Sequence, residues 1–201
     1  QMCIRDRHKC VGTAYGRSLK TLRYMDLELP FDNSFIPRDF NGDRWTASLY
    51  LSLILRQHDF TRSLFTFPES VFYRQGRLEH GITTMLRRVH RALLIEDRFD
   101  EETWQIIVEE EKKDLRFARD ESERLTTENF ALKPLYVLKA IAQRDATAFQ
   151  DRLEEALQGY KETCDFFGDE LYDPFGHFFA RRLTAYACLA HDRGLTVADP
   201  K

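Results

Sequence analysis

The stretch "LKPLYVLKAIAQRDATAFQDRLEEALQGY", residues 132–160, decides the fold of this chain. Its first part is apolar nearly all round, which is typical of a helix buried among other helices. Because proline is tolerated in the first turn of a helix and not in its interior, we expect this helix to begin close to Pro134. The Arg144-Asp145 step then leaves room for a tight turn, so the stretch predicts an antiparallel αα-hairpin. The apolar face of the second helix consists of Phe149, Leu153, Ala156, Leu157 and Tyr160.

A second copy of this pattern lies nearer the start of the chain, in "RWTASLYLSLILRQHDF", residues 44–60. Its apolar residues again go nearly all round a helix, and Ser48 and Ser52 are small enough to let another helix approach closely. We interpret His58-Asp59 as the equivalent of Arg144-Asp145, with Asp59 as the N-cap of the next helix. The chain therefore repeats a unit of buried helix, two-residue turn and amphipathic helix.

Further helices are predicted in the middle and at the end of the chain. Phe99, Asp100 and Trp104 have the order of a hydrophobic staple around an aspartate cap. Residues 81–94 and 179–190 each carry an apolar stripe at helical spacing. The sequence thus predicts a mainly α fold of stacked antiparallel αα-hairpins, a helical-repeat-like array. At most one or two short strands are expected near residues 24–31, where Met25, Leu27, Leu29 and Phe31 alternate with polar residues and no partner strand is evident.

The first forty residues divide into two parts. The string "QMCIRDR", residues 1–7, resembles read-through of sequencing adapter, so we exclude it from the fold and expect the natural protein to be longer. We interpret residues 8–40 as a partial N-terminal region with a short helix near residues 10–22 and one strand. Residues 41–198 form the predicted helical domain.

Composition excludes several classes of protein. The 201 residues are 43% hydrophobic and 31% charged, and no apolar run approaches the length of a membrane span. A net charge of −3, with basic residues scattered among acids, does not favour nucleic-acid binding. The four cysteines show no metal-binding or disulfide spacing, which indicates reduced thiols in a cytoplasmic protein.

The stretch "YACLAHDRGLTV", residues 186–197, raises the question of a metal-binding His-Asp pair at His191-Asp192. A metal-dependent phosphohydrolase would need further histidine and aspartate ligands converging on the same ion. The local pattern instead fits a helix end, with Gly194 as the left-handed residue and Leu195 folding back on Ala190. We therefore expect a helix C-terminus here.

Other catalytic patterns are missing from the sequence. It contains no GxSxG motif, no phosphate-binding glycine loop and no dinucleotide fingerprint. His90 lies beside an apolar stripe, as a structural histidine does, and Cys188 sits within a packed apolar run. Acids beside Cys164 are expected to raise the pKa of its thiol. We predict no catalytic, metal-binding or cofactor-binding residues and expect a protein that is not an enzyme.

The most suggestive surface feature is "CDFFGDELYDPFGHFF", residues 164–179, where aromatic residues alternate with acids. Such a loop could bind a basic protein through its aromatic and acidic side chains. Alternatively, its aromatic residues could pack in the core between two helices while the acids keep the loop hydrated. The acidic run "EEEKKD" at residues 109–114 is likewise a contact surface or a solvated helix face. The predicted partner-binding residues are Asp165, Asp169, Glu170, Tyr172 and Asp173, together with Glu109, Glu110 and Glu111.

Three segments together resemble the immunity protein 49 family of bacterial polymorphic toxin systems. They are "NGDRWTASLYLSLILRQHDF", "LKPLYVLKAIAQRDATAFQDRLEEALQGYKE" and "LTAYACLAHDRGLTV". Arg144, Asp145 and Phe149, with "CLAHDRG" at residues 188–194, carry the match between Asn41 and Val197. The resemblance implies a mostly helical cytoplasmic protein that binds and neutralises a cognate toxin, with no catalytic residues. The alternatives are a helical-repeat scaffold for a peptide or partner helix and a divergent metal-dependent phosphohydrolase.

Overall fold

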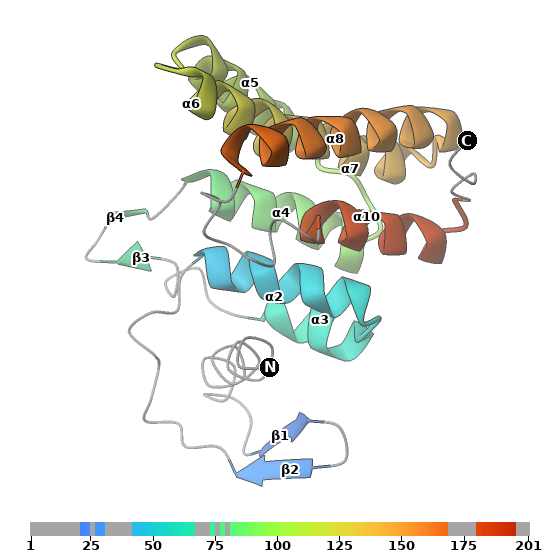
Figure 1. The fold of residues 1–201 in the computed structure, drawn as a ribbon. Coiled ribbons are helices and arrows are strands. Elements are labelled where there is room, and N and C mark those ends of the chain that lie inside the picture. The colour runs from blue at the N-terminus through green and yellow to red at the C-terminus, as the bar shows by residue number, and fades with distance from the viewer. Residues whose placement is uncertain are drawn as a thin grey trace. The chain divides into compact units, whose positions relative to one another are not determined.

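The computed structural model describes residues 21–24, 27–30, 42–66, 73–74, 77–78, 81–168 and 180–195. These residues are mainly α-helical, as the sequence predicted (Figure 1). The chain divides into two compact units, Gln1–Arg87 and Arg88–Lys201, with the boundary inside helix α4 (Gly81–Ile95). The predicted domain limits of 8–40 and 41–198 remain predictions.

Two short hairpins belong to the first unit. Strand β1 (Thr21–Tyr24) pairs antiparallel with β2 (Leu27–Pro30), and Tyr24 lies opposite Leu27. The predicted strand therefore has a partner, whose first two residues, Thr21 and Leu22, were expected to end a helix. Pairing with the preceding segment satisfies backbone groups that a lone strand would leave open. A second hairpin, β3 (Tyr73–Arg74) with β4 (Arg77–Leu78), was not predicted.

Helices α2 (Gly42–Ile54) and α3 (His58–Leu64) form the first αα-hairpin. Trp45 is 1% exposed, and its indole Nε1 donates to the Leu64 carbonyl at 2.9 Å. The hydroxyls of Ser52 and Thr61 lie 2.8 Å apart and join the two helices. The small serine side chain thus permits the close approach that the sequence predicted.

The turn between these helices differs from the predicted one. Arg56 adopts a left-handed conformation with φ 52°, and the next amide, that of Gln57, donates to the Ser52 carbonyl at 2.9 Å. Gln57 is the N-cap, so Asp59 lies in the first turn of α3 and does not cap it. The equivalent of Arg144-Asp145 is therefore Arg56-Gln57, two residues before the predicted pair.

In the second unit, α5 (Glu101–Arg116) begins as predicted. The Asp100 carboxylate accepts a hydrogen bond from the Thr103 amide at 3.1 Å, and the rings of Phe99 and Trp104 lie 6.1 Å apart. Trp104 Nε1 donates to the Leu135 carbonyl at 3.1 Å, which links α5 to the helix of residues 133–143. The staple prediction is confirmed.

One helical run continues from residue 121 to residue 143. It comprises α6 (Glu121–Leu125), the π-helical segment η2 (Thr126–Leu132) and α7 (Lys133–Gln143). Pro134 lies in the first turn of α7, as predicted, but the π-helical segment η2 precedes that turn without a break. The Lys133 amide donates to the carbonyl of Glu128, five residues back, as in a π-helix. The wider turn lies where the proline ring would clash with the carbonyl of Phe130, four residues earlier.

Helices α7 and α8 (Ala146–Phe167) lie side by side as the predicted αα-hairpin (Figure 1). Arg144 is left-handed with φ 54°, and the Asp145 carboxylate accepts from the Ala148 amide at 2.9 Å. On α8, Leu157 is 44% exposed, contrary to the prediction that it faces inward. Gly159 and Thr163 are buried, which shows that the contact face turns toward η2 in the second half of α8.

The last helix, α10 (Arg181–Asp192), completes the described part of the second unit. It packs against α7 and α8. A buried contact of 3.1 Å between His90 Nε2 and the Tyr186 hydroxyl links it to the C-terminal half of α4. His90 is 1% exposed, so its predicted structural role is confirmed.

Candidate functional site

The His-Asp pair marks the end of a helix. Gly194 has φ 79°, its amide donates to the His191 carbonyl at 2.9 Å, and the Leu195 amide donates to the Ala190 carbonyl at 2.9 Å. These two bonds form a Schellman ending, as predicted. His191 Nδ1 lies 3.4 Å from the Asp192 carboxylate. Within the described ranges, no group of three or more His, Cys, Asp or Glu residues is arranged to hold a metal ion.

The two described cysteines are free and half-buried. Burial is the main cause that raises the pKa of the Cys164 thiol, and the neighbouring Asp165 charge adds to the increase. The predicted direction is confirmed, although burial contributes more than the acid. A raised pKa disfavours the thiolate, which is the reactive form of cysteine.

The acids of α5 point in different directions. Glu109 and Glu110 are exposed and form ion pairs with Lys112 and Lys113, at 3.2 and 3.6 Å. Glu111 is half-buried, and burial raises the pKa of its carboxyl against the opposing charge of Arg182. Successive helical residues are turned by about 100°, so three consecutive glutamates do not share one face.

The second predicted acidic surface is described in part. Asp165 is exposed near the end of α8 and pairs with Lys161, one turn earlier. Phe166 is 51% exposed and meets the Phe167 ring edge-on at 5.2 Å. Its ring therefore does not close the core, which was the alternative interpretation of these aromatic residues. The other four predicted contacts, Asp169, Glu170, Tyr172 and Asp173, lie outside the described residues.

These two sets of acids lie on separate helices. Both α5 and α8 pack against η2. Each of these exposed acids pairs with a lysine of its own helix: Glu109 and Glu110 with Lys112 and Lys113 on α5, and Asp165 with Lys161 on α8.

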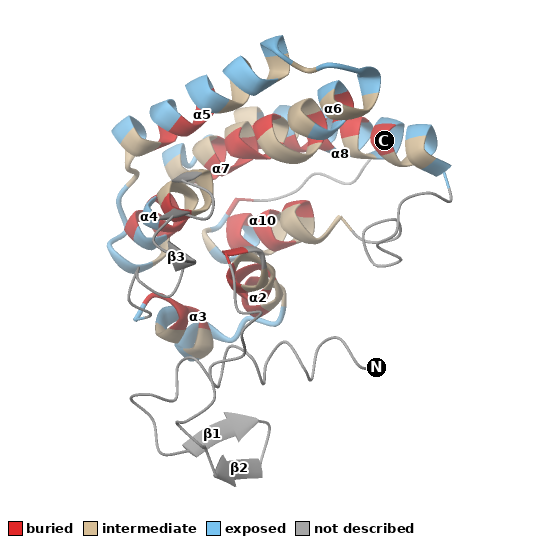
Figure 2. Cartoon of the chain, turned by 90° about the vertical axis from the view of Figure 1, so that its left-hand side faces the viewer, coloured by how far each residue is buried: buried red, intermediate tan, exposed pale blue. Residues whose placement is uncertain are grey.

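The outer face of α5 carries a feature that the sequence analysis missed. Ile106, Glu110, Lys113 and Phe117 follow one another at helical spacing, and Figure 2 shows exposed residues along this helix. Ile106 is 48% exposed and Phe117 is 74% exposed. The spacing from Ile106 to Phe117 was visible in the sequence, but burial was needed to show that this stripe faces outward.

A groove lies beside Phe117, where α5 gives way to α6. Its volume is about 390 Å³, and it is lined by Asp114, Phe117, Ser122, Glu123, Thr126 and Thr127. The Glu123 carboxylate accepts hydrogen bonds from the backbone and guanidinium of Arg119, which lower its pKa to about 2. The groove thus combines an exposed ring, two carboxylates and three hydroxyl groups.

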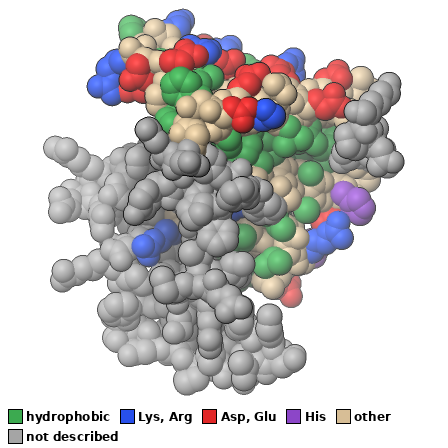
Figure 3. All heavy atoms as spheres, in the orientation of Figure 1, with side chains coloured by type: hydrophobic (Ala, Val, Ile, Leu, Met, Phe, Trp, Pro, Cys, Tyr) green, Lys and Arg blue, Asp and Glu red, His purple; other side chains and the backbone are tan. Residues whose placement is uncertain are grey.

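The second unit has an excess of acidic residues. Residues 88–201 include 24 Asp and Glu against 17 Lys and Arg, and α5 alone has six acids and three bases. Figure 3 shows acidic and basic side chains interleaved along the upper edge, where Figure 1 places α5 and α6. An excess of one charge favours encounter with a partner of the opposite sign.

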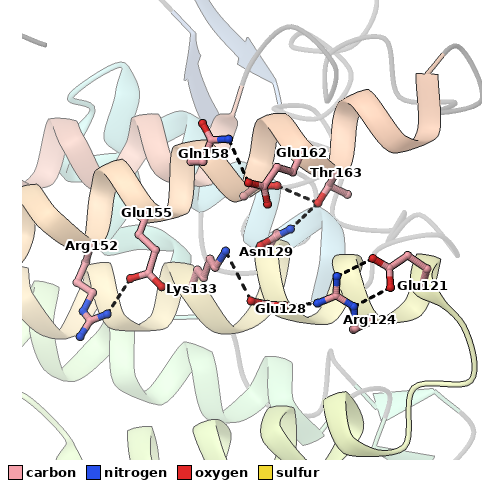
Figure 4. Close-up of polar contacts among 11 residues, drawn as sticks. Glu121, Arg124, Glu128, Asn129, Lys133, Arg152, Glu155, Gln158, Glu162 and Thr163 are labelled. Atoms are coloured by element: carbon pink, nitrogen blue, oxygen red, sulfur yellow. Dashed lines mark hydrogen bonds and ion pairs between the residues drawn. The ribbon is translucent and has the colours of Figure 1, made fainter. Parts of the chain in front are cut away.

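A buried polar contact joins η2 to α8 (Figure 4). The Asn129 amide donates to Thr163 Oγ1 at 2.8 Å, and Thr163 donates to the Gly159 carbonyl at 2.9 Å. Asn129 is 2% exposed, and its Oδ1 has no hydrogen-bond partner among the residues that the structure describes. A Cβ at Gly159 would lie 2.3 Å from that oxygen. Glycine is therefore required for this close approach.

The model of the family described as immunity protein 49 matches residues 6–198. The chain belongs to the immunity protein 49 family. The resemblance drawn from three segments of the sequence is thus confirmed, and the match also includes residues before Asn41. No match was found among curated proteins or among solved structures. Among its described helices, this immunity protein 49 family member has none with the length and apolar character needed to cross a membrane.

Proposed function

We propose that this protein binds a cognate bacterial toxin in the cytoplasm and neutralises it through a protein–protein interface. The family match over residues 6–198 carries the proposal. The rigid helical scaffold supports it, because helices hold exposed side chains in fixed positions for recognition. Inhibition then requires occlusion or distortion of the toxin and no bond-making by this chain.

The exposed acids remain the proposed contacts. Glu109, Glu110 and Asp165 are open to solvent and paired with flexible lysines. Such surface pairs contribute little to folding, so a partner can replace them at small cost. Glu111 is half-buried and is a weaker candidate than its neighbours. The predicted contacts Asp169, Glu170, Tyr172 and Asp173 belong to the same proposal.

Co-expression tests the function directly. The open reading frame next to this gene is induced in a sensitive bacterium, alone or with this protein, and survival is counted. A catalytically dead toxin controls for expression burden. We expect death with the toxin alone and growth with the pair. Continued death in the presence of the folded protein would contradict the proposal.

Stoichiometry separates binding from catalysis and from scaffolding. Purified toxin is titrated with this protein, and residual toxin activity is measured. If the protein neutralises by binding, toxin activity falls to its minimum near one equivalent of this protein, and the toxin remains chemically intact. An enzyme would inactivate the toxin at a small fraction of an equivalent. A complex without loss of toxin activity would favour the helical-repeat scaffold. Stoichiometric metal binding that His191→Ala abolishes would favour the phosphohydrolase.

A further inference from the structure

We propose that the groove beside Phe117 receives an arginine or lysine side chain of the toxin. This inference rests on the proposed function and names the chemistry of the contact. The receiving site consists of Phe117 and Asp114 at the end of α5 and Glu123 on α6, and we call it the Phe117 groove.

The side chain of Phe117 is not packed in the core, so core packing does not explain why an aromatic residue stands here. Its backbone amide donates to the Lys113 and Asp114 carbonyls at 3.1 Å and so ends α5, but any residue could supply that amide. The ring itself is 74% exposed. Burying an exposed phenylalanine ring favours binding, and aromatic residues at the centre of an interface often carry much of its binding energy.

The lining beside the ring suits a long cationic side chain. Asp114 and Glu123 supply carboxylates, and the hydroxyls of Ser122, Thr126 and Thr127 can accept further hydrogen bonds. A guanidinium or ammonium group can lie over the face of Phe117 while its methylene stem covers apolar surface. Within the described residues, no basic residue lines the groove, so a cationic side chain that binds there comes from a residue outside the lining.

Arg119 shows that a guanidinium fits the Glu123 carboxylate. Its Nε donates to Oε1 at 2.9 Å, and its backbone amide donates to Oε2 at 2.9 Å. The Arg119 side chain is itself 83% exposed, so it can be displaced. The Asp114 carboxylate makes no hydrogen bond or ion pair with any described residue, and it is free to pair with an incoming cation.

Two features extend the contact beyond the groove. Ile106 lies eleven residues before Phe117 on the same face of α5 and is 48% exposed, which offers a second apolar anchor about 16 Å away along the helix. The acid excess of α5 complements a basic surface. A partner that places an arginine in the Phe117 groove would thus cover Glu110 as well.

Binding to the purified toxin encoded by the adjacent gene tests this inference. Phe117→Ala and Asp114→Ala are compared with Leu157→Ala and Asp151→Ala, which remove an exposed apolar residue and an exposed acid from α8. We expect Kd to rise about tenfold or more for each groove variant and to change less than about twofold for each control. Thermal unfolding checks that all four variants are folded.

Hydrogen exchange provides a second measurement on the unaltered protein. Bound toxin is expected to slow exchange of the backbone amides of residues 113–127. If the wild type binds toxin but both groove variants bind equally well, or these amides are not protected, the groove assignment is overturned and the proposed function stands. If the wild type neither binds nor neutralises the toxin, the proposed function fails and the groove assignment fails with it.

Discussion

Arg182 Nη1 donates to the carbonyl oxygen of Phe130 at 3.0 Å, four residues before Pro134 in one helical run. In an α-helix this carbonyl would accept the amide of residue 134, which proline lacks. A guanidinium from α10, 52 residues away, takes that place. The same group donates through Nε to the Tyr186 hydroxyl at 3.2 Å. Arg182 therefore provides a donor for the carbonyl that the Pro134 nitrogen cannot serve.

Removing this guanidinium should destabilise the second unit. We expect Arg182→Ala to lower the free energy of unfolding by about 2 kcal/mol, because the Phe130 carbonyl and the Tyr186 hydroxyl each lose a charged partner. Urea denaturation followed by circular dichroism measures the change. Arg91→Ala, which removes an exposed arginine from α4, is the control and should cost less than about 0.5 kcal/mol.

The role of the proline follows from a double-mutant cycle. Pro134→Ala restores an amide near the Phe130 carbonyl, so Arg182→Ala should cost less in that background. An equal cost of Arg182→Ala in both backgrounds would show that the arginine does not compensate for the proline.

Gly159→Ala should be destabilising, although alanine is normally better than glycine within a helix by about 1 kcal/mol. The added methyl would lie 2.3 Å from Asn129 Oδ1 and 2.8 Å from Lys133 Nζ. Overpacking of this kind costs about 1–3 kcal/mol, which exceeds the gain in helix propensity. Melting temperatures of Gly159→Ala and Gly159→Ala/Asn129→Ala test this, since truncating Asn129 should recover part of the loss. A stabilised single variant would contradict the close approach.

Substitutions at the two left-handed residues Arg144 and Gly194, each at a helix end, should change the free energy of unfolding in opposite directions. Arg144 has φ 54° and ψ 32°, so Arg144→Gly should raise the free energy of unfolding by about 0.5 kcal/mol by relieving its backbone conformation. Gly194 has φ 79° and open space around its Cα, so Gly194→Ala should cost about 1 kcal/mol for backbone reasons alone. Changes of the same sign in both variants would refute this explanation.

Glu111 should make stability depend on pH. Because burial raises its pKa in the folded state above the ordinary 4.5, the folded protein binds its proton more tightly than the unfolded chain. Its contribution to stability is therefore lost as pH rises from about 4.5 through the raised value. Relative to wild type, Glu111→Gln should be more stable at about pH 7 than at about pH 3.5, as urea midpoints at each pH would show. The opposite trend would mean that attraction to Arg182 outweighs burial.

Charge reversal at Asp169 and Glu170 should slow association with the toxin. Acids on a rim act mainly on the rate of encounter, and salt screens that effect. We expect a lower association rate constant for Asp169→Lys/Glu170→Lys in low salt and a smaller difference in high salt, measured by stopped-flow mixing. Asp151→Lys on α8 is the control for net charge. If the association rate constant and the survival of toxin-expressing cells both stay unchanged, Asp169 and Glu170 are not part of the interface.

The sequence by itself determined the helices and several of their ends. The caps at Asp100 and Asp145 and the ending at Gly194 were predictable because each depends on residues within one or two turns. The inward stripe of α5 was predictable because it repeats with the helical period. The family was likewise recognisable from short segments.

Tertiary structure decided the features that depend on distant partners. The helical run continues past Pro134, and Arg182, far along the chain, donates to the Phe130 carbonyl that the proline nitrogen cannot serve. Leu157 turns outward because Gly159 and Thr163 meet η2 in its place. Phe117 became a candidate anchor only with the tertiary structure, because the structure shows that no packed segment among the described residues covers its ring. Local rules fix where a helix starts and stops, whereas packing decides which of its faces meets a partner.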